Sequence, residues 1–130
     1  MTNQELRIKV AEARGWDVYD REEYPEYYPF GKKSDLYGCF NDQKGEVPKY
    51  DTSIDACMEL VSEMAESTTD PYIEMSLKPM SADPDIIARF EILGPYKDSP
   101  LEFGELIALG YGKTLQDAIC NAYLEWKEEQ

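Results

Sequence analysis

Six acidic side chains between positions 51 and 70 are the groups in this sequence whose type and spacing could do chemistry. They recur at intervals of four, four, four, three and four residues: Asp51, Asp55, Glu59, Glu63, Glu66 and Asp70. A helix rises about 1.5 Å per residue, so a four-residue interval places carboxylates about 6 Å apart along one side. That separation is comparable with the separation of neighbouring phosphates on a nucleic acid strand. No lysine or arginine interrupts the segment from Tyr50 to Leu77.

Two interpretations of this acidic column stay open. In the first, it imitates a nucleic acid and binds a basic groove of another protein, with Tyr24, Tyr27 and Tyr28 adding aromatic contacts. In the second, it is a solvated face that keeps the protein soluble, as most charge runs on helices are. Like charges four residues apart each cost a few tenths of a kcal/mol. The opposite, apolar face must therefore hold such a helix in place.

Catalytic motifs are missing from the sequence. It contains no histidine, which removes Ser/His and Cys/His dyads and the HExxH zinc site. We find no GxSxG elbow, no CxxC pair and no calcium loop of the D-x-D-x-D-G type. We therefore expect no enzyme, no catalytic residues, no cofactor and no bound metal. A metal-dependent enzyme that uses carboxylates alone remains a third alternative.

One short motif resembles a ligand loop: Gly110, Gly112, Lys113 and Thr114, which follow a predicted strand and open a predicted helix. The helix N-terminus and Lys113 could receive an anion, which gives the alternative of a protein that binds or sequesters a nucleotide or metabolite. A Walker A loop also needs a glycine where this chain has Ile107, so that match fails. The competing interpretation is a glycine turn followed by a threonine cap.

Charge and cysteine content restrict the partners and the compartment. The chain has 27 acidic and 13 basic residues, a net charge of −14, which disfavours direct binding to nucleic acid or to an anionic membrane. A host protein with a basic surface fits better. Met1 to Gly15 is polar rather than an apolar signal sequence, so we expect a cytoplasmic protein. Cys39, Cys57 and Cys120 are odd in number and widely spaced, as expected for free thiols in a reducing compartment.

The periodicity predicts helices and strands in a defined order. We expect a first helix up to Arg14 that is capped by Thr2 or Asn3 and ended by Gly15. A central helix with Thr52 as N-cap and a closing helix with Thr114 as N-cap follow later. Three alternating segments predict an antiparallel meander at 72–77, 86–93 and 103–109, and 35–41 could be one more short strand.

The predicted core positions follow from the same patterns. In the first helix they are Leu6, Val10 and Ala13. In the central helix they are Ile54, Cys57, Met58, Val61, Met64 and Ala65. The first two strands of the meander contribute Ile73, Met75, Leu77, Ile86, Ala88, Phe90 and Ile92. In the closing helix they are Leu115, Ala118, Ile119, Ala122, Tyr123 and Trp126.

These elements predict an α+β fold with an antiparallel three- to four-stranded sheet and three helices, in the order α-(β)-α-β-β-β-α. Residues 1–130 should form a single domain. An irregular loop rich in tyrosine and acidic residues is expected at about 17–47, because Pro25 and Pro29 interrupt the segment and neither period fits it. This loop could cover one end of the core or contact a partner.

Two families resemble parts of the chain. The three strands and closing helix joined by GYGKT resemble the double-stranded RNA-binding domain, but Leu115, Gln116 and Asp117 replace that family's lysines, so we reject RNA binding. The segments TNQELRIKVAEARGW, VPKYDTSIDACMELVSEM and GKTLQDAICNAYLEW resemble the phage ABA sandwich domain. That resemblance covers roughly residues 2–16 and 47–128. It implies a phage or prophage origin and an α/β layered fold, and it supplies no catalytic residues.

From these observations we expect a small acidic, noncatalytic binding protein encoded by a phage or prophage. It would act in the host cytoplasm on a host protein, as a counter-defence or anti-CRISPR-type inhibitor. The sequence does not indicate an oligomeric state.

Overall fold

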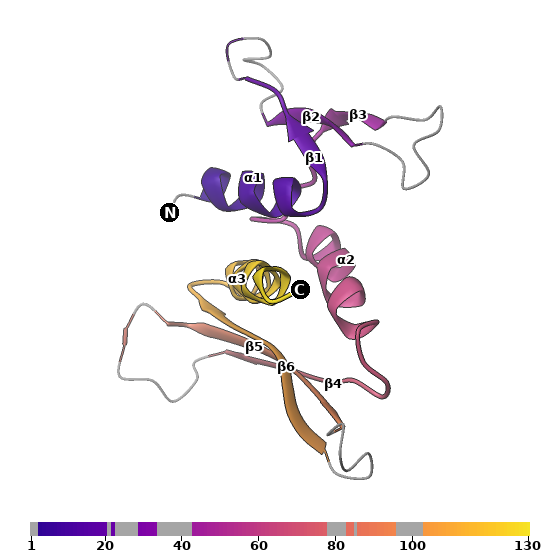
Figure 1. The fold of residues 1–130 in the computed structure, drawn as a ribbon. Coiled ribbons are helices and arrows are strands. Elements are labelled where there is room, and N and C mark those ends of the chain that lie inside the picture. Colours follow the sequence, from indigo (N-terminus) through magenta and orange to yellow (C-terminus); the bar gives the residue numbers. More distant parts are fainter. Residues whose placement is uncertain are drawn as a thin grey trace. The chain divides into compact units, whose positions relative to one another are not determined.

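The computed structural model of the chain describes residues 3–20, 22, 29–33, 43–77, 83–84, 86–95 and 103–130. The chain divides into two compact units, Met1–Lys49 and Tyr50–Gln130 (Figure 1), and the single domain stays a prediction. Each unit combines helix with an antiparallel three-stranded sheet, in the overall order α-β-β-β-α-β-β-β-α. The predicted α+β class is therefore confirmed.

The first unit consists of α1 (Asn3–Ala13) and a sheet of β1 (Trp16–Val18), β2 (Phe30–Lys33) and β3 (Gln43–Glu46). Both strand pairs are antiparallel, and β2 lies in the middle. The prediction of an irregular loop at about 17–47 was therefore wrong for these strands. Their three or four residues are too few to show a period, and their fold depends on the pairing between strands.

Some predictions for the first unit fall on residues that the structure does not describe. These are Tyr24, Tyr27, Tyr28 and the short strand proposed at 35–41. Their contribution to a contact surface stays a prediction.

The helix α1 ends where the sequence indicated. Gly15 has a φ of +94°, a left-handed conformation that glycine adopts at low cost, and its N–H donates to the carbonyl of Glu12. Leu6 and Val10 are buried as predicted, whereas Ala13 is only half-buried. Asn3 already belongs to the helix rather than capping it.

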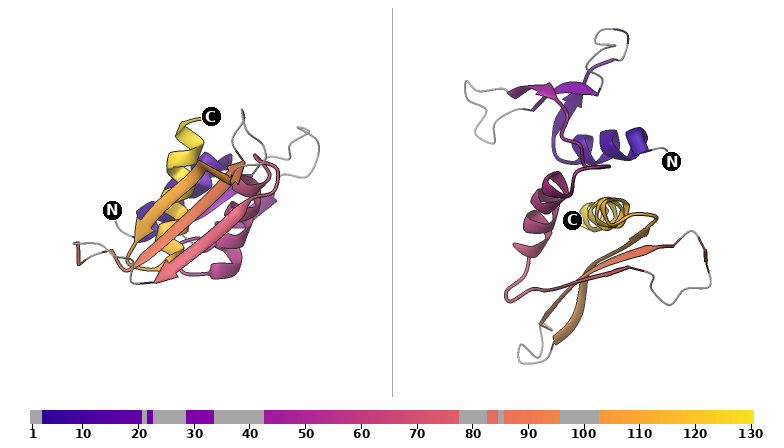
Figure 2. Two further views of the ribbon diagram at one scale, coloured as in Figure 1. Left: turned by 90° about the horizontal axis from the view of Figure 1, so that it is seen from below. Right: turned by 180° about the vertical axis from the view of Figure 1, so that it is seen from behind.

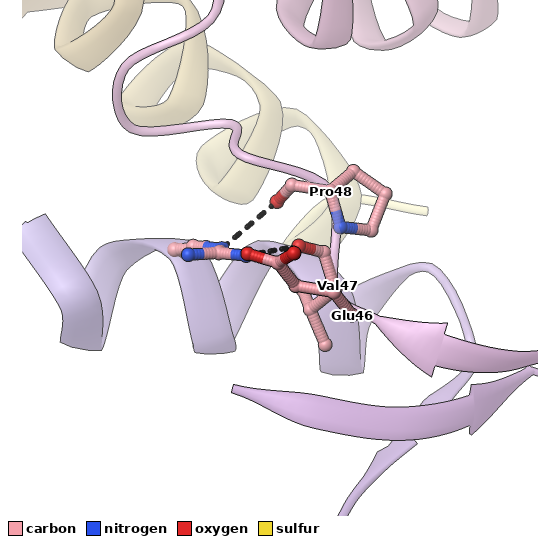
Figure 3. Close-up of polar contacts among 4 residues, drawn as sticks. Glu46, Val47 and Pro48 are labelled. Carbon is pink, nitrogen blue, oxygen red and sulfur yellow. Dashed lines mark hydrogen bonds and ion pairs between the residues drawn. The ribbon is translucent and has the colours of Figure 1, made fainter. Parts of the chain in front are cut away.

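Arg7 is the polar residue that organises this unit. Its side chain is only 10% exposed, and it reaches the chain that follows β3 (Figure 3). Nε donates to the carbonyl of Pro48 at 3.1 Å, while Nη2 donates to the carbonyl of Val47 and to Oε1 of Glu46 at 3.3 Å. One guanidinium therefore joins α1 to three consecutive residues about 40 positions away.

Replacing Arg7 with methionine is expected to lower the free energy of unfolding by about 2 kcal/mol, because two carbonyls then lose their charged donor. Urea denaturation measures the effect. Lys9→Met is the matched control, since Lys9 is an exposed cation on the same helix. Equal effects of the two substitutions would contradict a structural role for Arg7.

The second unit has the order α-β-β-β-α. It consists of α2 (Ile54–Ala65), β4 (Tyr72–Leu77), β5 (Ala88–Pro95), β6 (Phe103–Gly112) and α3 (Leu115–Glu128). The strands form an antiparallel sheet in the order β4-β5-β6, which confirms the predicted meander. Both helices lie on one side of this sheet, α3 over β5 and β6 and α2 beside α3 (Figures 1 and 2).

The core of the second unit lies between α3 and the middle of the sheet. On β5, Ala88, Phe90 and Ile92 are fully buried as predicted, while Ile86 precedes the strand. On α3 the predicted stripe is buried except for Leu115, which is half-buried. The long amphipathic patterns of β5 and α3 thus identified the core correctly.

Two glycines of β6 allow α3 to approach the sheet closely. An added Cβ on Gly110 would lie 2.1 Å from the carbonyl oxygen of Ala118 and 2.5 Å from the backbone nitrogen of Ala122. A Cβ on Gly112 would meet Asp117 at 2.5 Å. The predicted glycine turn at this point was therefore wrong, because both glycines belong to the strand.

The prediction of a half-buried β4 was also wrong. Ile73, Met75 and Leu77 were expected to be inside, but they are 39%, 40% and 71% exposed. The reason is that β4 is an edge strand whereas α3 packs over β5 and β6. In the described ranges no helix is long and apolar enough to cross a membrane.

Candidate partner-binding surface

The helix α2 begins one residue later than its sequence suggested. Ser53, rather than Thr52, is the N-cap, and its hydroxyl accepts a hydrogen bond from the N–H of Ala56 at 3.3 Å. Asp55 lies in the first turn, where a carboxylate is stabilised by the helix dipole. The cap and this acidic residue fix the start of the helix and hence the direction of its faces.

The buried side of α2 differs in part from the prediction. It consists of Cys57, Leu60, Val61 and Met64. Ile54 and Met58, which were predicted to be buried, are 39% and 42% exposed, and Ala65 is half-buried. The apolar pattern is wider than the surface that the rest of the unit covers, so periodicity alone could not locate its centre.

Three of the six predicted acidic residues share one exposed face, which we term the acidic face: Asp55, Glu59 and Glu66. At 3.6 residues per turn they fall within about 40° of one another around the helix axis. They point away from the buried side. Their carboxylates are therefore presented to solvent in a row.

The other three acidic residues of the predicted column lie outside the acidic face. Asp70 is exposed but follows the helix, in a turn where its φ is +49°. Glu63 is half-buried, and its Oε2 lies 4.0 Å from Nζ of Lys127 on α3. Asp51 is half-buried, and its Oδ1 is enclosed with no hydrogen bond in the described part of the chain. The predicted column of six is thus a row of three with separate acids beyond it.

Most of the net charge belongs to the second unit. Residues 50–130 contain 17 acidic and five basic residues, a net charge of −12, out of −14 for the whole chain. Residues 1–49 contain ten acidic and eight basic residues. A field of this strength attracts cationic surfaces and accelerates their association. The division was readable from the sequence only once the boundary between the units was known.

Two buried thiols lie next to the start of α2. The Sγ atoms of Cys57 and Cys120 donate to the same carbonyl, that of Tyr50, at 2.9 and 3.3 Å. Both cysteines are free and fully buried, as predicted. The neighbouring thiol of Cys57, burial, and the carboxylates of Asp117 and Asp51 raise the pKa of the Cys120 thiol. These thiols are structural donors rather than nucleophiles.

The raised pKa of Cys120 predicts a loss of stability at high pH. The unfolded thiol, with a pKa of about 8.5, ionises first as the pH rises, so the contribution is complete below that pH and declines above it. The expected slope is about 1.4 kcal/mol per pH unit. Urea denaturation of the wild type and of Cys120→Ala between neutral pH and about pH 10 measures it. Parallel curves for the two proteins would contradict the assignment.

The candidate anion loop has a structural use. Oγ1 of Thr114 accepts from the N–H of Asp117 at 3.1 Å and so caps α3, as the competing interpretation predicted. The carboxylate of Asp117 lies in the first turn, where a bound anion would need to be. Gly110 and Gly112 pack beneath the helix, and Lys113 is exposed. No cradle for a phosphate is formed by these residues.

A shallow depression of about 530 Å³ lies at the other end of the unit, between the turn after α2 and the end of α3. It is mainly polar, and Thr68, Glu105, Trp126 and Glu129 are among its lining residues. Its volume is within the range of small-ligand sites, although such sites are mostly apolar. Two carboxylates make it unsuitable for an anionic nucleotide. Among the described residues, no cluster of acidic residues and cysteines could hold a metal ion.

No family model, curated protein or solved structure matches this chain. The resemblance to the phage ABA sandwich domain therefore remains a prediction.

Proposed function

We propose that this protein is a noncatalytic binding protein whose acidic face occupies a basic surface of another protein in place of nucleic acid. The observation that carries the proposal is the row formed by Asp55, Glu59 and Glu66 on the exposed side of α2. The row lies in the unit that carries a charge of −12. A solubilising surface needs charge but no alignment.

The spacing of these carboxylates supports the mimicry. Asp55 and Glu59 are about 6 Å apart along the axis, and Glu66 lies about 10 Å further on. Basic grooves that bind nucleic acid use lysine and arginine side chains to neutralise successive phosphates. Long flexible cations can reach carboxylates at either interval. The buried side of α2 holds the backbone of the row in place, so no backbone has to be ordered on binding.

The proposed setting is a bacterial cell that contains a phage or prophage. The partner would be a host protein with a basic groove, such as a component of a defence system. This part of the proposal depends on the sequence resemblance and on the charge, because a polyanionic surface is suited to inhibiting a nucleic-acid-binding protein.

Affinity capture from a bacterial lysate, followed by mass spectrometry, tests the proposal. We expect one or more basic, nucleic-acid-binding proteins to be retained at low salt and released as the salt concentration rises. Retention that is insensitive to salt, or of proteins without a basic surface, would contradict it. The lysate is treated with nuclease beforehand so that nucleic acid does not bridge the two proteins.

A second candidate function rests on the depression near Thr68 and Trp126. Its two carboxylates, Glu105 and Glu129, favour a neutral or cationic metabolite. A thermal-shift panel of amines, amino acids and nucleosides tests this alternative, since a ligand that binds the folded state raises the melting temperature. Glu129→Gln would then reduce the shift.

A further inference from the structure

Among the described strands, β4 has one neighbour only. It pairs with β5 along its whole length, and no other strand pairs with it in the part of the chain that the structure describes. All of its residues except Ser76 are exposed. An exposed edge of this kind presents unpaired backbone N–H and C=O groups, which can receive a further strand.

The apolar residues of β4 belong to a core face that is not fully covered. Ile73 pairs with Ile92 and Met75 pairs with Phe90, and both residues of β5 are completely buried. Residues opposite each other in a sheet point to the same face. Ile73 and Met75 therefore continue the core face outward, yet they are 39% and 40% exposed, and Leu77 is 71% exposed. The core is incomplete along this edge.

The opposite face of the sheet carries an unbalanced charge next to the same edge. Glu74 lies directly opposite Glu91, and like charges at that position repel each other. Glu91 forms an ion pair with Arg89. A hydrogen bond with Tyr111 and the carboxylates of Glu91 and Glu74 raise the pKa of Arg89. The ion pair of Arg89 is with Glu91, so a cation beside Glu74 would balance the second carboxylate of the pair.

We propose that β4 receives an extended segment of a partner protein as a fourth strand of the sheet. The segment carries apolar side chains at alternate positions, which contact Ile73, Met75 and Leu77. A lysine or arginine lies at the intervening position opposite Glu74. The inference rests on the proposed function in one respect, because it takes the partner to be basic.

The charge of β4 favours a segment of another protein over a second copy of this chain. The strand contains Glu74 but no lysine or arginine. A second copy joined antiparallel through its own β4 would therefore bring a further carboxylate to this edge and could not supply the cation beside Glu74. A segment that carries a lysine or arginine at that position supplies it.

Binding of a short fluorescent peptide in which valine and lysine alternate tests the inference. We expect saturable binding measured by anisotropy, with amide chemical-shift changes that are largest along β4. The Glu74→Gln variant should bind roughly two- to fivefold more weakly, as expected for a cross-strand charge pair. Met75→Ser should also weaken binding, whereas Leu106→Ser, an exposed leucine on the other edge strand, should not.

Two control peptides separate the contribution of the peptide's charge from that of its backbone hydrogen bonds. A valine–glutamate peptide should not bind, and a valine–lysine peptide with N-methylated amides should lose binding because it cannot pair with the edge. Binding that Glu74→Gln and Met75→Ser leave intact would overturn the inference. Absence of binding would overturn it as well, and so would a β4-dependent dimer in sedimentation experiments.

A different variant tests the proposed function separately from the proposed fourth strand. Neutralising Asp55, Glu59 and Glu66 should abolish salt-sensitive capture of the basic partner but leave β4 the site of the largest shifts with the peptide. If capture of the partner is unaffected by Glu74→Gln and Met75→Ser but is lost when Asp55, Glu59 and Glu66 are neutralised, the proposed fourth strand is contradicted. The proposed role of the acidic face is then supported. If the peptide binds at β4 and capture does not depend on the carboxylates of α2, the proposed role of the acidic face is contradicted and the fourth strand is supported.

Discussion

Gly110→Ala is expected to lower the free energy of unfolding by about 3 kcal/mol or more. The new methyl group would lie 2.1 Å from the carbonyl oxygen of Ala118 and 2.8 Å from Cβ of Ala122. Neither contact is with the flexible end of a side chain, so α3 must shift as a whole. Such a shift would separate the helix from Phe90 and Ile92 beneath it and open the best-packed part of the unit.

Gly45→Ala is the matched control for this substitution, because a Cβ at Gly45 would meet no atom within 4 Å. Urea denaturation followed by circular dichroism compares both variants with the wild type. We expect the control to change stability by less than about 1 kcal/mol. A Gly110→Ala protein as stable as the control would mean that α3 does not pack on β6 as described.

Neutralising the acidic face is expected to produce the largest loss of binding. The triple variant Asp55→Asn, Glu59→Gln and Glu66→Gln should weaken the complex with the captured partner by tenfold or more. Each exposed ion pair contributes about 0.2–1 kcal/mol, and three together reach the 1.4 kcal/mol that corresponds to a factor of ten. Surface plasmon resonance with the purified partner measures the affinity and its salt dependence.

A second triple variant controls for net charge. Glu125→Gln, Glu128→Gln and Glu129→Gln remove the same three charges from exposed positions near the end of α3. If binding depends on the alignment of α2 carboxylates, this variant should keep an affinity close to that of the wild type. If both triple variants lose affinity equally, total charge rather than the acidic face determines binding.

The elements predicted correctly are those whose sequence pattern repeats often enough to define a face. The stripe of α3 and the alternation of Ala88, Phe90 and Ile92 on β5 each indicated their buried side, because these elements are covered by others. The thiols of Cys57 and Cys120 followed from the same pattern. Thr114 as the cap of α3 followed from local side-chain chemistry.

The elements predicted wrongly depend on contacts that no local pattern encodes. The alternation in β4 is as regular as that in β5, but burial requires a helix above the strand, and α3 packs over β5 and β6. The strands β1, β2 and β3 are too short for a period and exist through their pairing. Gly110 was taken for a turn because glycine in a strand and glycine in a turn look alike without the neighbouring helix.

The candidate site was predictable to a similar extent. The acidic spacing identified the exposed side of α2 through Asp55, Glu59 and Glu66. It also included Glu63, which lies near Lys127, and Asp51, which is partly enclosed. Spacing gives the direction of a side chain along one helix but contains no information about a neighbouring helix or about residues beyond the helix ends.

Competition with nucleic acid tests most directly whether the acidic face stands in for phosphates. The measurement is displacement of this protein from its purified basic partner by a double-stranded oligonucleotide, with polyglutamate of equal charge concentration as the control. We predict that the oligonucleotide displaces the protein completely and that polyglutamate is much less effective. A stable ternary complex of protein, partner and oligonucleotide would contradict the proposed mimicry.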